Sequence, residues 1–220
     1  MNRVSLVCTV HKEMERANVA ELHKILVHLR PSVIFLEVPA EAMVDHFETC
    51  VQQNLESMAV RRYRKDHAVQ LVPVDLPTPP IEFFGAGTQL NRRIQDESPG
   101  YRQLLQNDSI YVRTYGFAYL NSEYNSKLWL DAYAEMANTI HRLSDPSLAE
   151  IYELWKGKLE LRDVAMMRGI LEYCAQNAFD RGVFLVGAAH RQRIIELATE
   201  QSSATATRIQ WDFPNCRFDG

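Results

Sequence analysis

The sequence predicts an α/β fold in which a mainly parallel central sheet is flanked by helices, with a helical insert in the middle of the chain. Short apolar runs rich in Val, Ile and Leu alternate with longer segments whose apolar residues recur at helical spacing. At the start of the chain this alternation gives the order strand, helix, strand, helix, strand. That order is typical of parallel strands joined by right-handed helical crossovers.

The first two strands and two helices are expected within the first 64 residues. Residues 4–10 (VSLVCTV) form a buried strand, and the helix after it ends before Pro31. Residues 33–38 (VIFLEV) form the second strand, and residues 42–64 carry apolar side chains on one face of a second helix. The third strand, residues 69–75 (VQLVPVD), is the least regular because it contains a proline.

The middle of the chain departs from this pattern. Residues from about 77 to 160 begin as a loop and become helical and rich in tyrosine, so we expect an insert that packs over one end of the sheet. Within it, Ser-Asp-Pro at 144–146 indicates a capped helix start. The α/β pattern then resumes, and we expect one domain over residues 1–220 that ends with a helix over about 160–180, a strand over 183–188, a helix over about 191–200 and a strand over 207–213.

Composition restricts the class of protein. The net charge of −4 and the pI near 6 do not favour a nucleic-acid or anionic-membrane surface. The four cysteines show no CxxC spacing, which fits reduced thiols. The start of the chain lacks a signal-like apolar run, and no stretch approaches the roughly 18 apolar residues of a membrane span. We therefore expect a cytoplasmic protein with no membrane span and no nucleic-acid partner.

Titratable side chains follow each of the first four expected strands. His11 follows the first strand, Glu37 ends the second, Asp75 ends the third, and the fourth runs through Gly187 to His190. Ligands of open parallel sheets bind beyond the carboxyl ends of the strands, where these side chains would converge. A histidine after a strand is more often a loop or capping residue, and Asp75 can equally be a turn former. A carboxylate in an apolar strand is costly unless it has a partner. Glu37 is therefore the strongest of these indications that a functional site lies at this edge.

Two imidazoles and a carboxylate on one edge suit two kinds of chemistry. They could bind a divalent metal ion with an open position for water. They could also act without metal, one histidine taking a proton from water while a carboxylate orients it. Arg162 and Asp163 fall near the start of an expected helix. They could form a surface ion pair. Alternatively, the arginine lies at the same edge of the sheet and binds a catalytic carboxylate or a substrate carbonyl or carboxylate.

Four segments in this order resemble the TraB/PrgY/TIKI superfamily and, more distantly, the erythromycin esterase and ChaN-like proteins. They are CTVHKE (8–13), VIFLEVP (33–39), LRDVAMM (161–167) and VGAAH (186–190). The resemblance implies an α/β core with catalytic residues His11, Glu37, Arg162 and His190. Asp75, Asp163 and Gly187 would contact the substrate or support these residues.

The resemblance leaves the reaction open. TIKI members look like metal-dependent proteases, which implies Mn, Co or Zn bound by His11, Glu37 and His190. Erythromycin esterases hydrolyse an ester with a similar site, and ChaN-like relatives bind haem. We therefore expect a hydrolase of an amide or ester bond in a small-molecule or peptide substrate, and the alternative is a non-catalytic protein that binds a small molecule, haem or a peptide. The aromatic residues of the insert are expected to form its core or to cover the site.

Overall fold

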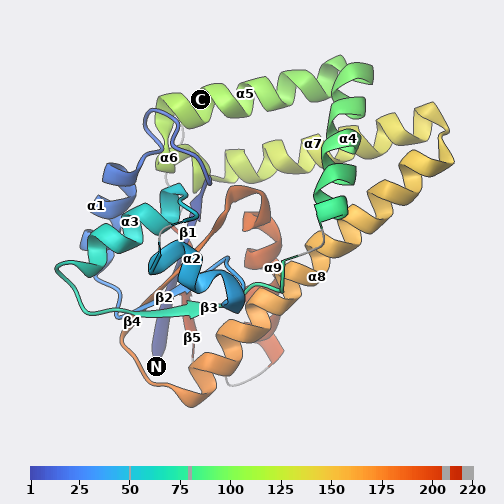
Figure 1. Ribbon diagram of the computed structural model, residues 1–220. Coiled ribbons are helices and arrows are strands. Elements are labelled where there is room, and N and C mark those ends of the chain that lie inside the picture. Colours follow the sequence, from blue (N-terminus) through green and yellow to red (C-terminus); the bar gives the residue numbers. More distant parts are fainter. Residues whose placement is uncertain (50, 79–80, 205–208, 215–220) are drawn as a thin grey trace.

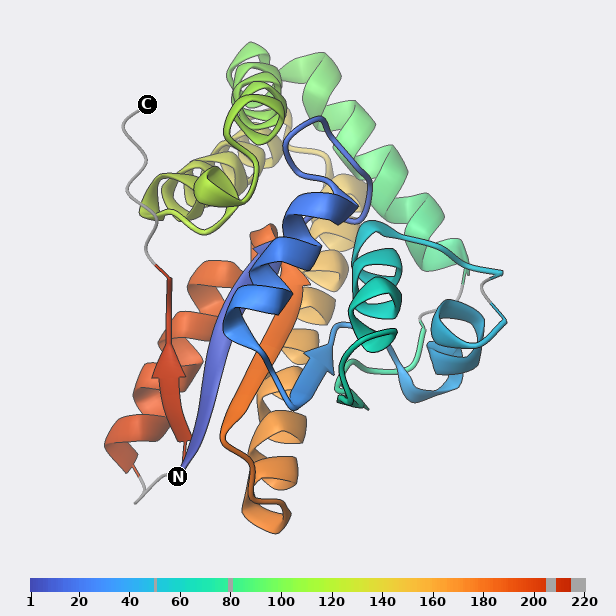
Figure 2. The same ribbon diagram turned by 90° about the vertical axis from the view of Figure 1, so that its left-hand side faces the viewer.

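The computed structural model describes residues 1–49, 51–78, 81–204 and 209–214. Five parallel strands in the order β3-β2-β4-β1-β5 form its central sheet, with helices on both faces (Figures 1 and 2). The fold class predicted from the sequence is thereby confirmed. The strands are β1 (Asn2–Thr9), β2 (Val33–Leu36), β3 (Gln70–Pro73), β4 (Arg181–Gly187) and β5 (Ile209–Asp212).

The register of the strands brings three carboxyl ends to one edge of the sheet. Thr9, the last residue of β1, is level with Gly187, the last residue of β4. Leu36, the last residue of β2, is level with Leu185 of β4. The residue after each of these strands therefore enters the same small region, as expected for parallel strands.

Helices from the two halves of the chain cover opposite faces of the sheet. The helices α1 (Val19–Leu29) and α3 (Leu55–Arg64) pack against each other on one face, while α9 (Arg191–Ala204) and the C-terminal part of α8 (Pro146–Gln176) lie on the other (Figure 2). Apolar side chains of all four helices join the buried strands in one core cluster. This placement follows from right-handed crossovers that run in opposite directions from the middle of the sheet.

The helix expected over residues 42–64 is interrupted, so this prediction is wrong. The structure has a short 3-10 turn, η1 (Ala40–Ala42), a five-residue helix, α2 (Met43–Phe47), and then α3. A capping box starts α3 anew, because the Asn54 side chain accepts a hydrogen bond from the Ser57 N–H at 2.8 Å and the Ser57 hydroxyl lies 3.1 Å from the Asn54 N–H.

The helix expected over about 160–180 is not a separate element. It is the C-terminal half of α8, which has 31 residues and begins, as predicted, with Asp145 as its cap and Pro146 in its first turn. The two halves of this continuous helix pack in different places. Leu148 belongs to a second apolar cluster within the helical layer, whereas Met166 and Ile170 belong to the core at the sheet.

The helical layer lies beyond the carboxyl ends of the strands (Figure 1). Besides the first half of α8 it contains α4 (Ile81–Glu97), α5 (Pro99–Tyr115), α6 (Phe117–Leu120) and α7 (Glu123–Leu143). The buried side chain of Asn121 ties this layer to β1, accepting from the Cys8 N–H at 2.8 Å and donating to the Cys8 carbonyl at 3.2 Å. Among the described residues, none of the helices has the length and apolarity that a membrane span requires.

Candidate functional site

Glu37 lies at the centre of the site, directly after β2, with 7% of its side chain exposed. Its Oε2 accepts a hydrogen bond from the Gly187 N–H at 2.6 Å. Its Oε1 lies 2.5 Å from Arg162 Nη2 and 3.3 Å from His190 Nε2. Burial alone would raise the pKa of Glu37, but its hydrogen bond with His190 and the positive charges of His190 and Arg162 hold the pKa well below its usual range. Glu37 is therefore a permanent anion between two cations.

Arg162 joins Glu37 to Asp75. Its Nε and Nη2 atoms approach the two oxygens of Asp75 at distances between 2.7 and 3.2 Å, a bidentate pair that fixes the plane of the guanidinium group. No described residue accepts a hydrogen bond from Nη1 of Arg162. The side chain is 23% exposed, so part of the guanidinium group is open to solvent.

His190 forms the buried end of the network. It follows β4 in a short 3-10 turn, η2 (Ala188–His190), and its Nδ1 lies 2.5 Å from Asp163 Oδ1. Burial by itself lowers the pKa of His190, but hydrogen bonds to Asp163 and Glu37 and their negative charges outweigh burial and raise it to about 10. At neutral pH the imidazole is a cation whose two N–H groups both donate.

Arg162 and Asp163 are neighbours on α8 and act on different partners. The arginine points to Glu37 and Asp75, and the aspartate points to His190. This answers the question that the sequence left open, because the pair lies in the site and is not a surface pair.

His11 lies at the same edge but in a more open position, with 60% of its side chain exposed. Its Nδ1 is 3.1 Å from Oε1 of Glu56, which also accepts the hydroxyl hydrogen bond of Thr9 at 2.7 Å. A β-carbon built on Gly187 would lie 4.0 Å from Nε2 of His11 and 3.3 Å from Oε2 of Glu37, so the imidazole faces the Glu37 side of the site. The hydrogen bond to Glu56 raises the pKa of His11 above 6.5 and outweighs the opposing effect of burial.

The structure thus brings six of the residues singled out from the sequence into one connected network, and places His11 beside it. The network consists of Glu37, Asp75, Arg162, Asp163, Gly187 and His190. Sequence reasoning missed Glu56 and Thr9. The available signal was Glu56 itself, a carboxylate next to Leu55 on the helix face that is buried against the sheet.

The donor groups as arranged do not fit the expected metal site. Within the described part of the chain, no group of three or more His, Cys, Asp or Glu side chains is placed to hold a metal ion. A histidine ligand must be neutral, whereas His190 is protonated and engaged at both nitrogens, and Arg162 occupies Oε1 of Glu37. This arrangement therefore gives no support to the metal binding by His11, Glu37 and His190 that the sequence suggested.

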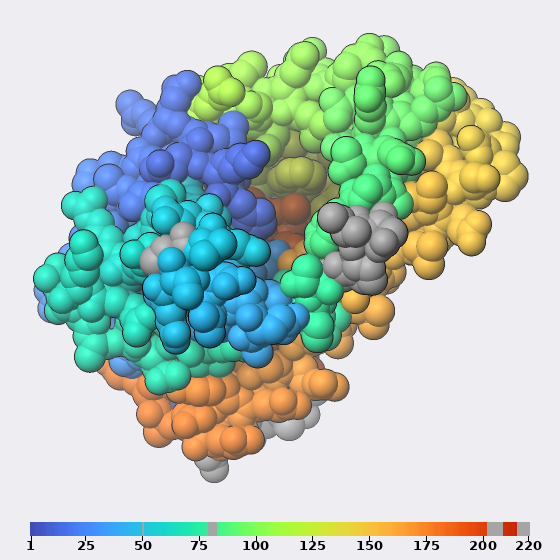
Figure 3. All heavy atoms as spheres, in the orientation of Figure 1, coloured from blue at the N-terminus to red at the C-terminus, as the bar shows by residue number. Residues whose placement is uncertain are grey.

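The site lies on a hollowed face of the molecule. Figure 3 shows a depression between the N-terminal part of the chain and α4, with C-terminal residues (orange to red) at its floor. In the same orientation, Figure 1 shows the carboxyl ends of the strands beneath it. Among the side chains of the site, His11 is the most exposed, at 60% against 23% for Arg162 and 9% for His190.

Comparisons with known proteins found no match. No family model matches the sequence, and neither a curated protein nor a solved structure matches it. The resemblance to the TraB/PrgY/TIKI superfamily stays a prediction, and the function has to be argued from the site.

Proposed function

We propose that this protein is a hydrolase that cleaves an ester or amide bond at the edge formed by His11, Glu37, Arg162 and His190. The observation that carries the proposal is the different state of the two histidines. His190 is a buried cation held by two carboxylates, whereas His11 is exposed and has one nitrogen engaged by Glu56. The hydrogen bond to Glu56 raises the pKa of His11 above 6.5, and its exposed position lets the imidazole exchange a proton with water.

His11 is the general base in this proposal. Because Glu56 accepts a hydrogen bond from Nδ1, the neutral imidazole carries its lone pair on Nε2. Nε2 takes a proton from water while the water oxygen attacks the carbonyl carbon of the substrate. When the bond to the leaving group breaks, the leaving oxygen or nitrogen takes that proton from His11. No covalent intermediate with the protein is required.

Arg162 stabilises the oxyanion in this scheme. The bidentate contact with Asp75 and the contact with Glu37 hold its guanidinium plane fixed, so its free Nη1–H can meet the developing charge without reorganisation. Glu37 has too low a pKa to act as a base. We assign it the role of positioning Arg162, His190 and the backbone of Gly187.

The substitution His11→Ala tests the proposal. Purified protein would be assayed with a panel of 4-nitrophenyl esters and 4-nitroanilides, beside His141→Ala, which removes an exposed histidine at the end of α7. We expect a loss of at least about 100-fold in kcat for His11→Ala, within the usual contribution of a general base, with an unchanged thermal midpoint. Equal turnover by wild type and His11→Ala would refute the proposal, as would a lack of turnover across the panel, which would favour a ligand-binding protein.

A further inference from the structure

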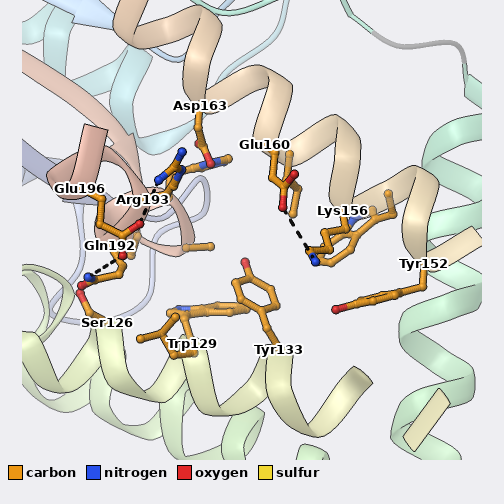
Figure 4. A pocket seen from close by; sticks show the side chains of 16 residues that line it. Ser126, Trp129, Tyr133, Tyr152, Lys156, Glu160, Asp163, Gln192, Arg193 and Glu196 are labelled. Atoms are coloured by element: carbon orange, nitrogen blue, oxygen red, sulfur yellow. Dashed lines mark hydrogen bonds and ion pairs between the residues drawn. The ribbon is translucent and has the colours of Figure 1, made fainter. Parts of the chain in front are cut away.

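A second feature lies on the other side of His190. A pocket of about 230 Å³ opens between α7, α8 and the start of α9, and His190 and Asp163 form part of its wall. Figure 4 shows Trp129 and Tyr133 on α7 facing Asp163, Glu160 and Lys156 on α8 across this space. The pocket and the proposed catalytic site therefore share the imidazole of His190.

Aromatic rings form a continuous wall of the pocket. The ring centroids of Trp129 and Tyr133 are 5.7 Å apart, those of Tyr133 and Trp155 are 5.8 Å apart, and those of Trp155 and Tyr152 are 6.3 Å apart. These separations are typical of interacting aromatic pairs. A flat ring of a ligand can add to such a series by edge-to-face or offset contacts.

The charged side chains around the pocket are paired with one another. Lys156 lies 4.0 Å from Glu160, and Arg193 lies 3.2 Å from Glu196 (Figure 4). Asp163 is paired with His190. A charged ligand would find no unpaired side chain of opposite charge in this lining. A neutral ligand is therefore favoured.

Tyr133 supplies a polar contact inside the aromatic wall. No described residue hydrogen-bonds its hydroxyl group. Burial, and secondarily the charge of Asp163, raises the pKa of Tyr133, so the hydroxyl stays protonated and can donate to an oxygen of a ligand. The pocket therefore combines apolar aromatic surface with polar donors, among them the Tyr133 hydroxyl.

We propose that this pocket binds a neutral aromatic group of the substrate, one or two fused rings in size, on the side of His190 away from Glu37. The size follows from the volume, since a cavity of about 150 Å³ is enough for a benzene molecule. This substrate class rests on the proposed hydrolase function. The binding of the aromatic group itself can be measured without turnover.

The probe is N-methyl-2-naphthamide, a neutral two-ring amide, titrated by calorimetry. The three tryptophans of the chain allow a matched comparison, because Trp129 and Trp155 line the pocket while Trp211 lies on β5 and stacks on Phe213. We expect Trp129→Ala and Trp155→Ala to raise Kd about tenfold or more, and Trp211→Ala to change it less than twofold. Tyr133→Phe removes only the hydroxyl and should weaken binding several-fold with the same thermal midpoint.

Two further ligands and one variant separate the inference from the proposed function. The anion 2-naphthoate and the saturated N-methylcyclohexanecarboxamide should both bind more weakly than the naphthamide. His11→Ala, which does not line the pocket, should bind the naphthamide like the wild type while failing to hydrolyse ethyl acetate in a pH-stat assay. This combined result would support both proposals.

The failures are also distinguishable. If the naphthamide does not bind, or binds Trp129→Ala and Trp155→Ala as tightly as the wild type, the pocket assignment is overturned, even where hydrolysis of ethyl acetate still depends on His11. If the naphthamide binds as described and no ester or amide is cleaved, the pocket assignment is supported and the hydrolase proposal fails.

Discussion

The Nδ1 atom of His11 lies 3.1 Å from Oε1 of Glu56, across 45 residues of sequence. Thr9 donates its hydroxyl to the same oxygen, so the carboxylate is fixed in an orientation that suits an Nδ1–H donor. This contact does two things for a general base. It selects the tautomer with a free Nε2, and it raises the pKa of the imidazole.

Glu56→Gln should therefore separate these two effects. A neutral amide no longer raises the pKa of His11, so the histidine stays unprotonated at lower pH. We expect the acidic limb of the kcat/KM profile to move to lower pH, towards a midpoint near 6.5, while the plateau rate falls because the tautomer is less well fixed. Rates between pH 5 and 9 would be measured beside Glu172→Gln, an exposed change on α8 that should leave the profile as it is. An acidic limb that does not move would show that another group titrates.

Gly187→Ala tests how closely the site is packed. The added methyl would lie 3.3 Å from Oε2 of Glu37, which is also the acceptor of the Gly187 N–H. The backbone φ of −57° suits alanine, so the change acts on the carboxylate and not on the fold. We expect kcat to fall by about tenfold or more with little change in thermal midpoint, since small displacements of positioned groups are costly.

Gly157→Ala is the matched control for this change. It lies within α8, and a β-carbon there would meet no atom within 4 Å. Alanine in a helix interior stabilises by about 0.5–1 kcal/mol relative to glycine, so a slightly higher midpoint and unchanged kcat are expected. Equal kcat in wild type and Gly187→Ala would show that the position of Oε2 does not matter for turnover.

The network was predictable from the sequence to the extent that strand ends define it. Glu37, Asp75 and His190 follow apolar runs that the sequence marks as strands, and the parallel register then brings these strand ends to one edge. Glu56 was not predictable in this way. It lies at the start of α3, and only the packing of that helix against the end of β1 brings it to His11.

The helical layer shows the limit of periodicity. The spacing of apolar residues indicates that a segment is helical. It does not show which neighbour each apolar face contacts, because the contacts between helices depend on the tertiary fold. The rings of Tyr111 and Tyr119 therefore pack against each other in a tilted pair, with their centroids 5.3 Å apart, whereas Trp129 and Tyr133 line the pocket beside His190. The helix expected to begin near residue 160 is instead the second half of α8, whose apolar residues belong to two separate clusters.

Because of His190, the folded protein should lose stability as the pH rises into the alkaline range. Its pKa is about 10 in the folded protein against 6.5 ordinarily, because Asp163 and Glu37 outweigh the effect of burial. A raised pKa stabilises the folded state fully below pH 6.5, and this stabilisation is lost as the pH rises towards about 10. We expect the free energy of unfolding to decrease over this interval by at most about 1.4 kcal/mol per pH unit.

His190→Gln identifies the source of this dependence. The variant should lose the alkaline decrease and should be less stable at pH 6 by about 3–5 kcal/mol, because Asp163 keeps its buried charge without its partner. His141→Gln, at an exposed position, should follow the wild type. Urea unfolding at several pH values would measure all three proteins, and an alkaline decrease retained in His190→Gln would assign it to another group.

Hydrolysis should survive removal of divalent metal ions. Both oxygens of Glu37 already accept from protein donors, and a metal would have to displace the Arg162 guanidinium group and remove a proton from His190. We therefore expect kcat to be unchanged after dialysis against EDTA, and elemental analysis of gently purified protein to find no stoichiometric Mn, Co or Zn. The contrary result would be near-stoichiometric metal in the wild type that both His11→Ala and His190→Ala lose. It would mean that Arg162 moves away from Glu37 when metal binds, and that the ligand set expected from the sequence forms in the metal-bound protein.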